Sequence, residues 1–187
     1  MGQATSAHSD SEEAANVHED PSYHFQLVGQ KYLYQWQTRQ MPEDLDVAIE
    51  YLRKSLDSMP EDSLHEAGYL GNLGLSLINR HRITSRAVDV EEGILLAEQA
   101  LDLTAFEDPY KAGLLQNLGI AYRTEYTASH SLQDLEHCVK LFEEAYDHPE
   151  VDEIQKQTCL HGIADGRFIK HERTQSMADL EKGFTRC

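Results

Sequence analysis

The apolar positions of this chain follow helical spacing from residue 21 onward. In three stretches, apolar or small residues recur at i, i+3, i+4 and i+7, which places them on one face of a helix. These stretches are Phe25/Val28/Gly29/Tyr32, Leu70/Leu73/Gly74/Leu77 and Leu115/Leu118/Gly119/Tyr122. No segment alternates apolar and polar residues as a half-buried strand does. The pattern therefore predicts an all-α protein.

The helical pattern repeats every 45 residues. Gly29, Gly74 and Gly119 are separated by this interval, and the next step reaches Ala164. A second motif keeps the same interval through four copies: Asp44-Leu45-Asp46, Asp89-Val90-Glu91, Asp134-Leu135-Glu136 and Asp179-Leu180-Glu181. Two independent motifs that share one period predict a stack of similar units, each made of two antiparallel helices.

Each unit carries signals for two helix starts. Asp20-Pro21, Ser63-x-x-Glu66 and Asp108-Pro109 mark the first helices, and Pro42, Ser131 and Ser176 mark the second helices. These residue types cap helix N-termini or occupy the first helical position. Small residues recur within the second helices at Ala48, Gly93 and Cys138. Together with the repeated glycine of the first helices, they predict a close approach between the two helices of a unit.

The domain organisation follows from where the pattern begins and stops. Residues 1–20 hold five carboxylates, no Lys or Arg and few large apolar side chains, which predicts a disordered acidic tail. Residues 21–187 are expected to form three complete units and an incomplete fourth. Because the fourth copy stops short, we expect either a fragment or self-association through an uncapped C-terminal end.

The apolar face around the repeated glycine, followed by small and large positions in a second helix, resembles the tetratricopeptide repeat, whose usual length is 34 residues. The longer unit, with its Asn-Leu-Gly and Asp-Leu-Glu signatures, looks like the arrays of fungal and bacterial proteins that are joined to CHAT or NTPase modules. This resemblance covers about residues 21–187 and implies a right-handed α-solenoid of antiparallel helix pairs. Arrays of this kind serve many partners.

The resemblance also implies a concave groove lined by the first helices, which binds a peptide or a partner helix. Its groove face maps onto Gln26, Gln30, Asn72, Leu75, Ile78, Gln116, Asn117, Ile120 and Arg123. The alternative is that Leu75, Ile78 and Ile120 only pack between helices, and the sequence favours neither reading. A carboxylate clamp for a chaperone C-terminus is not expected, because Gln26, Gly113 and Asn117 stand where that clamp needs cations.

Composition narrows the classes of partner. The formal net charge is −17, from 33 acidic and 16 basic residues, which argues against nucleic acid and anionic membranes as ligands. The three cysteines lack CxxC spacing, so no disulfide framework or zinc site is expected. No apolar run is long enough to span a membrane and no signal-peptide core is present. A cytoplasmic protein is the expectation.

Candidate chemistry is sparse. The repeated acidic pairs fall in the first turn of a predicted helix, where a carboxylate complements the helix dipole, so capping explains them better than catalysis. The ten histidines form no HxxxH or HExxH pair and no GxSxG motif is present. Cys138 takes a small core position. We therefore expect no enzyme activity, no metal and no cofactor.

Basic residues gather near the ends of the first helices. Stacking would align Arg39, Arg80, Arg82, Arg86, Arg123, Arg167, Lys170 and Arg173 along one edge. This basic edge either docks an acidic partner or complements helix C-termini, and the second interpretation is favoured.

The sequence as a whole predicts a non-catalytic scaffold or adaptor for a protein or peptide partner. One alternative is a membrane-tethered regulator, because Met1-Gly2-Gln3-Ala4-Thr5-Ser6 fits the N-myristoylation pattern at Gly2. The acidic residues that follow would weaken such a tether. Another alternative is an accessory subunit of an enzyme.

Overall fold

The computed structural model describes residues 20–61 and 63–175. Within these residues it contains seven α-helices and no strand. The helices are α2 (Pro21–Arg39), α3 (Pro42–Asp57), α4 (Glu66–Thr84), α5 (Ala87–Asp102), α6 (Lys111–Ser129), α7 (Leu132–Asp147) and α8 (Glu153–Thr174). The all-α prediction is confirmed for the described residues.

The helix boundaries repeat with the period of the sequence. The first helices α2, α4 and α6 have 19 residues each and begin 45 residues apart. The second helices α3, α5 and α7 have 16 residues each and keep the same interval. Three units of the sequence therefore have the same secondary structure.

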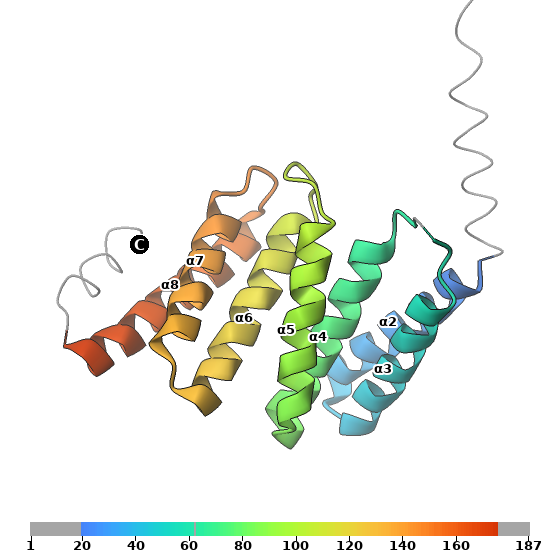
Figure 1. Cartoon of the computed structure of the whole chain (residues 1–187), viewed down its shortest axis with the longest axis horizontal. Coiled ribbons are helices and arrows are strands. Elements are labelled where there is room, and N and C mark those ends of the chain that lie inside the picture. Colours follow the sequence, from blue (N-terminus) through green and yellow to red (C-terminus); the bar gives the residue numbers. More distant parts are fainter. Residues whose placement is uncertain (1–19, 62, 176–187) are drawn as a thin grey trace, which may run out of the picture.

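The helix pairs follow one another along the longest axis of the molecule (Figure 1). Each helix packs against the next one in the chain, and the first helices of successive pairs also touch. Among the described residues, α2 and α3 make no contact with α6, α7 or α8. The loops that join one pair to the next all lie along the same side of the array, at the top of the view in Figure 1. The architecture is thus an open row of helix pairs, and not a closed globule.

The first helices all end in the same way. The residues that follow α2, α4, α6 and α8, the first helix of the fourth unit, are Gln40, Ser85, His130 and Gln175, and all have φ between 53° and 58°. The N–H of each of these residues donates to the carbonyl four residues earlier, as in a left-handed helix cap. Only two residues separate α2 from α3. The 45-residue unit therefore joins two long helices by a short turn.

Several predicted helix starts are confirmed and two are wrong. Asp20 and Ser131 cap α2 and α7 with their side chains, and Pro42 is the first residue of α3. In contrast, α4 and α6 begin at Glu66 and Lys111, with no side-chain cap. Ser63 and Asp108 instead accept hydrogen bonds from the N–H groups two residues later, at His65 and Tyr110. They close the turn before the helix. Ser176 lies outside the described residues.

The repeated glycine allows the two helices of a pair to approach closely. A Cβ placed on Gly74 would lie 3.0 Å from the carbonyl oxygen of Gly93 and 3.4 Å from the amide nitrogen of Ala97. A Cβ placed on Gly93 would in turn lie 3.1 Å from the Gly74 carbonyl oxygen. Both neighbours are backbone atoms that cannot rotate away. The predicted close contact between α4 and α5 is confirmed.

The core is a series of small clusters between consecutive helices. One cluster joins α3 to α4 through Ile49, Leu52, Leu73 and Leu77. Another joins α6, α7 and α8 and contains Cys138, which is fully buried. Burial raises the pKa of the Cys138 thiol to about 12, so the side chain behaves as a small apolar residue. The prediction of a core position for Cys138 is confirmed.

Other predictions concern residues outside the described part. The acidic tail (all but Asp20), the lipidation motif at Gly2 and the second helix of the fourth unit with its uncapped end fall in residues 1–19 and 176–187. Among the described helices, none combines the length and the apolar character needed to cross a membrane.

Candidate binding groove

A cavity of about 550 Å³ lies along the first helices α2, α4 and α6. We call it the groove. Residues 64–65 of the loop 58–65 and three residues of the loop 103–110 contribute to its lining. The lining residues are Tyr23, Gln26, Leu27, Gln30, Leu64, His65, Ala67, Gly68, Tyr69, Gly71, Asn72, Thr104, Asp108, Tyr110, Gly113, Leu114 and Asn117. One cavity thus spans three successive units.

Four of the predicted groove residues line this cavity: Gln26, Gln30, Asn72 and Asn117. Gln30 is exposed, and Asn72 and Asn117 are half-buried. Their side-chain amides can both donate and accept hydrogen bonds. The register of the first helices places these amides on the same side of the array.

The other predicted groove residues lie elsewhere. Ile78 is completely buried, and Ile120 packs against its cluster. Leu75 packs against the cluster that contains Leu33. Gln116 is buried and uses its amide to donate to the backbone oxygen of Gln155 and to the sulfur of Cys159, both at 3.1 Å. For Leu75, Ile78 and Ile120, the contacts match the alternative of packing between helices.

Arg123, the last predicted groove residue, forms an ion pair with Asp165 of α8. It occupies the same relative position as Ile78 and Leu33 do in the two preceding units. The contact between successive first helices is therefore apolar at two junctions and ionic at the third. Arg123 also lines a second cavity of about 420 Å³ near the C-terminal ends of α4 and α6.

Two glycines of the groove have no packing reason to be glycine. Gly68 and Gly113 are 45 residues apart, in the first turns of α4 and α6, and a Cβ placed on either would meet no atom within 4 Å. Glycine in a helix costs roughly 0.5–1 kcal/mol relative to alanine, which nothing in the fold offsets here. Because these glycines have no side chain, the backbones of α4 and α6 are directly accessible from the cavity at these two positions. Neither glycine was predicted as a groove residue, although their 45-residue spacing was a usable signal.

One buried polar atom of the lining residues has no hydrogen-bond partner, namely Oε1 of Gln26, whose residue is 3% exposed. The hydroxyl of Tyr69, which is 5% exposed, interacts with the side chain of Ser22. Burial is the main cause that raises the pKa of Tyr69, so its hydroxyl stays protonated and can donate. A buried polar group without a partner costs roughly 1–3 kcal/mol. Among the described lining residues, Gln26 Oε1 is therefore the buried polar atom that lacks a hydrogen-bond donor.

Apart from His65, Thr104 and Asp108, the rest of the lining is apolar or aromatic, and the lining contains no Lys or Arg. Leu27, Leu64 and Tyr110 are largely exposed at the edge of the groove. Asp108 is the one carboxylate among the lining residues. Exposed apolar side chains that border a cavity are typical of a surface that buries part of another molecule.

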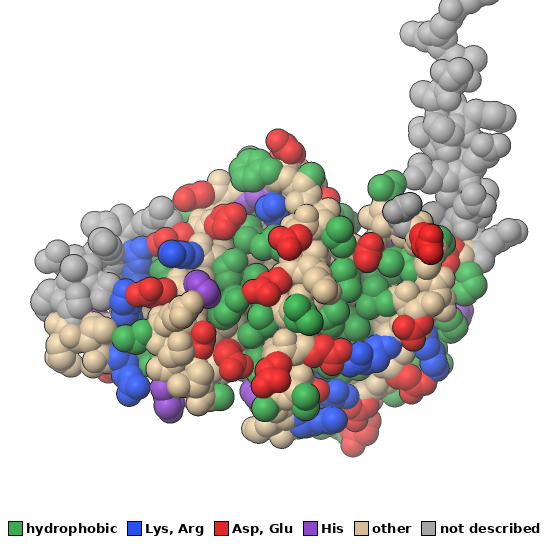
Figure 2. Space-filling view, in the orientation of Figure 1, with side chains coloured by type: hydrophobic (Ala, Val, Ile, Leu, Met, Phe, Trp, Pro, Cys, Tyr) green, Lys and Arg blue, Asp and Glu red, His purple; other side chains and the backbone are tan. Residues whose placement is uncertain are grey.

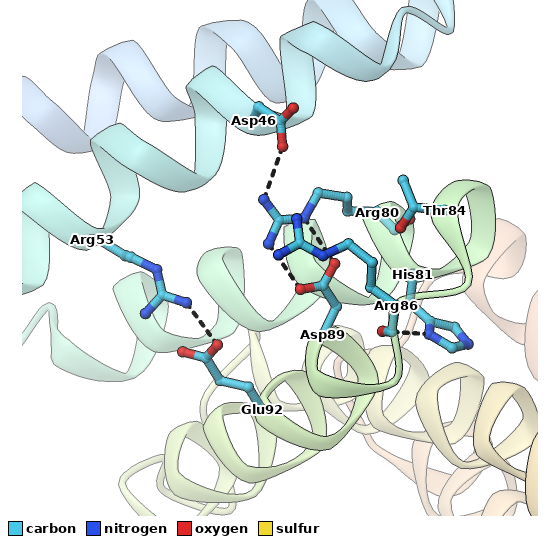
Figure 3. Close-up of polar contacts among 8 residues, drawn as sticks. All are labelled: Asp46, Arg53, Arg80, His81, Thr84, Arg86, Asp89 and Glu92. Carbon is cyan, nitrogen blue, oxygen red and sulfur yellow. Dashed lines mark hydrogen bonds and ion pairs between the residues drawn. The ribbon is translucent and has the colours of Figure 1, made fainter.

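Several cations of the predicted basic edge are paired within the chain. Figure 3 shows Arg80 between Asp46 of α3 and Asp89 of α5. Its Nε and Nη2 donate to Asp89 and its Nη1 donates to Asp46, each at 2.8 Å. Arg80 holds the pKa of the Asp89 carboxyl below its usual range, against the effect of burial. Asp89 thus lies in the first turn of α5, without capping it, and pairs with Arg80 of α4.

The remaining cations of the basic edge differ in their partners. Arg167 pairs with Glu143, and Lys170 pairs with Glu136. Arg82 is exposed and contacts Asn79, and Arg86 lies close enough to Asp89 to lower the pKa of that carboxyl. In Figure 2, acidic side chains extend along the array, whereas Lys and Arg gather mainly near the α8 end and near the lower ends of α3 and α5. An acidic partner would have to compete with carboxylates of the chain itself.

The pairing of Arg80 with Asp46 recurs two units later, where Lys170 pairs with Glu136 at the same relative positions. At the junction between them, these positions hold Glu91 and Glu125, which cannot form an ion pair. Charge pairing thus ties α3 to α4 and α7 to α8, but not α5 to α6 at this site.

The described residues show few features of a catalytic or metal-binding site. They contain no group of three or more His, Cys, Asp or Glu side chains arranged to hold a metal ion. Asp44, Asp89 and Asp134 all lie in the first turn of a second helix. Comparisons with protein-family models and with curated proteins find no match for the chain. The groove is therefore the candidate functional site of the described residues.

Proposed function

We propose that the chain is a non-catalytic scaffold or adaptor that binds an extended segment of another protein in the groove. In this proposal the helix pairs form a right-handed, tetratricopeptide-like solenoid, and the first helices line its concave side. Because the lining offers amides and aromatic side chains but no candidate nucleophile or metal site, binding fits it better than catalysis. A cytoplasmic location belongs to the same proposal.

The observation that carries the proposal is that one cavity crosses three first helices and has Gln30, Asn72 and Asn117 along it. Parallel helices packed side by side lie about 10 Å apart, so three of them span about 20 Å. An extended segment of about six residues covers this distance at roughly 3.3 Å per residue. Side-chain amides are suited to such a ligand, because they can pair with both the N–H and C=O groups of its backbone.

The first test replaces two of these amides. The variant Asn72→Ala/Asn117→Ala is expected to recover at least about tenfold less partner in affinity capture, since each lost hydrogen bond is worth about 1 kcal/mol. Quantitative mass spectrometry of the captured proteins gives the measurement. Circular dichroism should show unchanged helicity.

The matched control is Gln133→Ala/Gln157→Ala, which removes two exposed amides outside the groove. This control should capture the partner as well as the unaltered chain does. If the Asn72→Ala/Asn117→Ala variant captures the same proteins in the same amounts as the control, the groove is not the binding surface and the proposal fails.

A further inference from the structure

The charges around the groove point to the kind of segment that it accepts. The described parts of the two loops that border it contain Glu61, Glu107 and Asp108 and no Lys or Arg. Glu66 and Asp20 lie at the adjacent starts of α4 and α2. These carboxylates outweigh the partial positive charge of the helix N-termini, which is about half a unit charge each.

Lys111 directly follows the second loop, and its Nζ donates to the backbone oxygen of Thr104 at 3.1 Å. Its single positive charge is outnumbered by the five carboxylates named above. A cationic ligand would therefore be attracted to the mouth of the groove, whereas an acidic ligand would meet like charge. Since the whole chain carries a formal charge of −17, its long-range field acts in the same direction.

The unpartnered polar atom of the lining, Gln26 Oε1, requires a hydrogen-bond donor. Gln26 Oε1 can only accept, and it is buried without a donor. The Tyr69 hydroxyl can accept as well as donate. A guanidinium or ammonium group that enters beside them supplies several donors at once, and a carboxylate supplies none.

Two glycines leave room for the backbone of a ligand at the groove. Gly68 and Gly113 leave open space above two neighbouring helices, and Leu27, Leu64 and Tyr110 stand around it. Close approach of a ligand backbone is one of the few uses that glycine has within a helix. The exposed Leu and Tyr side chains would then cover aliphatic side chains of the ligand.

From these observations, and resting on the proposed function, we infer that the groove binds an extended peptide segment with a Lys or Arg side chain flanked by aliphatic residues. The basic side chain lies against Gln26, Tyr69 and Asp108, and the peptide backbone passes over Gly68 and Gly113. The chain's own residues 1–19 fit poorly, because they contain four carboxylates and no Lys or Arg. A second copy of the chain brings a further excess of negative charge.

The test is a selection from a display library of random peptides about twelve residues long, enough to exceed the span of the groove. The full chain is used in three forms: unaltered, Gly68→Leu and Thr158→Leu. Thr158 is the residue one unit beyond Gly113 and is exposed outside the groove, so it controls for added bulk at the same position of a first helix. Thermal melts check that both variants fold.

The unaltered chain and Thr158→Leu should enrich the same peptides, with Lys or Arg beside aliphatic residues, and Gly68→Leu should lose them. In fluorescence anisotropy, replacing the basic residue of an enriched peptide with Gln should weaken binding at least tenfold. The affinity should also fall as the ionic strength rises.

Every other outcome overturns either this inference alone or the inference together with the scaffold proposal. Groove-dependent enrichment of acidic or uncharged peptides would end this inference and leave the scaffold proposal standing. No enrichment, or enrichment that Gly68→Leu does not change, would end both. Cross-links from residues 1–19 into the groove of the free chain, or a dimer that Gly68→Leu abolishes in light scattering, would assign the groove to another occupant and overturn the inference.

Discussion

Replacing Arg80 with alanine is expected to lower the free energy of unfolding by about 3 kcal/mol. The Arg80 side chain is 13% exposed and makes two hydrogen bonds to Asp89, whose side chain is 4% exposed. Without Arg80, a buried carboxylate loses both of these hydrogen bonds, which costs more than the loss of a surface ion pair. Chemical denaturation followed by circular dichroism measures the difference.

Two substitutions serve as controls for the Arg80→Ala variant. Arg82→Ala removes an exposed cation two residues away and should change stability by no more than about 0.5 kcal/mol. Arg80→Ala/Asp89→Ala should recover part of the loss, since it removes the buried carboxylate as well. Equal effects of Arg80→Ala and Arg82→Ala would show that the pair with Asp89 does not support the fold.

The effect of Arg80→Ala should also depend on pH. Arg80 lowers the pKa of Asp89 in the folded state, so the stability from this pair is present above the pKa of an unfolded Asp, about 3.9. It is lost as the pH falls through the lower pKa of the folded state. The difference between the unaltered chain and Arg80→Ala should therefore be largest near neutral pH and shrink in acid. A difference that stays constant would contradict this origin.

Gly74→Ala is expected to destabilise the protein by about 2 kcal/mol, within the range for overpacked cores. The added Cβ would press on the Gly93 carbonyl oxygen at 3.0 Å, and α5 can yield only as a whole helix. Gly68→Ala, six residues earlier in the same helix, should instead stabilise by about 0.5–1 kcal/mol, because its Cβ meets no atom within 4 Å.

The opposite signs of these two changes separate packing from helix propensity. Both replace glycine with alanine in α4, so both gain the same intrinsic preference. Denaturant midpoints of the two variants give the comparison. Stabilisation by Gly74→Ala would mean that α4 and α5 do not approach as closely as the structure shows.

The periodic features of the fold could be predicted from the sequence. The interval between Gly29, Gly74 and Gly119 gave the number of units among the described residues, and Pro42 and Ser131 gave helix starts within a residue. The left-handed residues that end the first helices could not be predicted. They are Gln, Ser, His and Gln, and only glycine would have signalled that conformation.

The groove could be predicted only in part, and the reason is physical. Helical spacing shows which residues share a face of one helix, but not which neighbouring helix covers that face. Asn72 and Asn117 remain at the cavity, whereas Ile78 and Arg123 contact the next first helix. The ion pairs of the basic edge could not be predicted for the same reason. Asp46 of α3, which pairs with Arg80, is 34 residues away in sequence.

The central claim is that a 45-residue unit builds equivalent helix pairs that stack in a row. Duplicating residues 66–110 inside the full chain tests it most directly, because the second copy would start where α6 now starts. Glu91 would then face a second Arg80 and gain the ion pair that it lacks. We expect cooperative unfolding, unchanged helicity per residue and a larger radius of gyration in X-ray scattering, since stacked repeats extend in one dimension. Loss of cooperative unfolding, or a particle that grows equally in all directions, would contradict the claim.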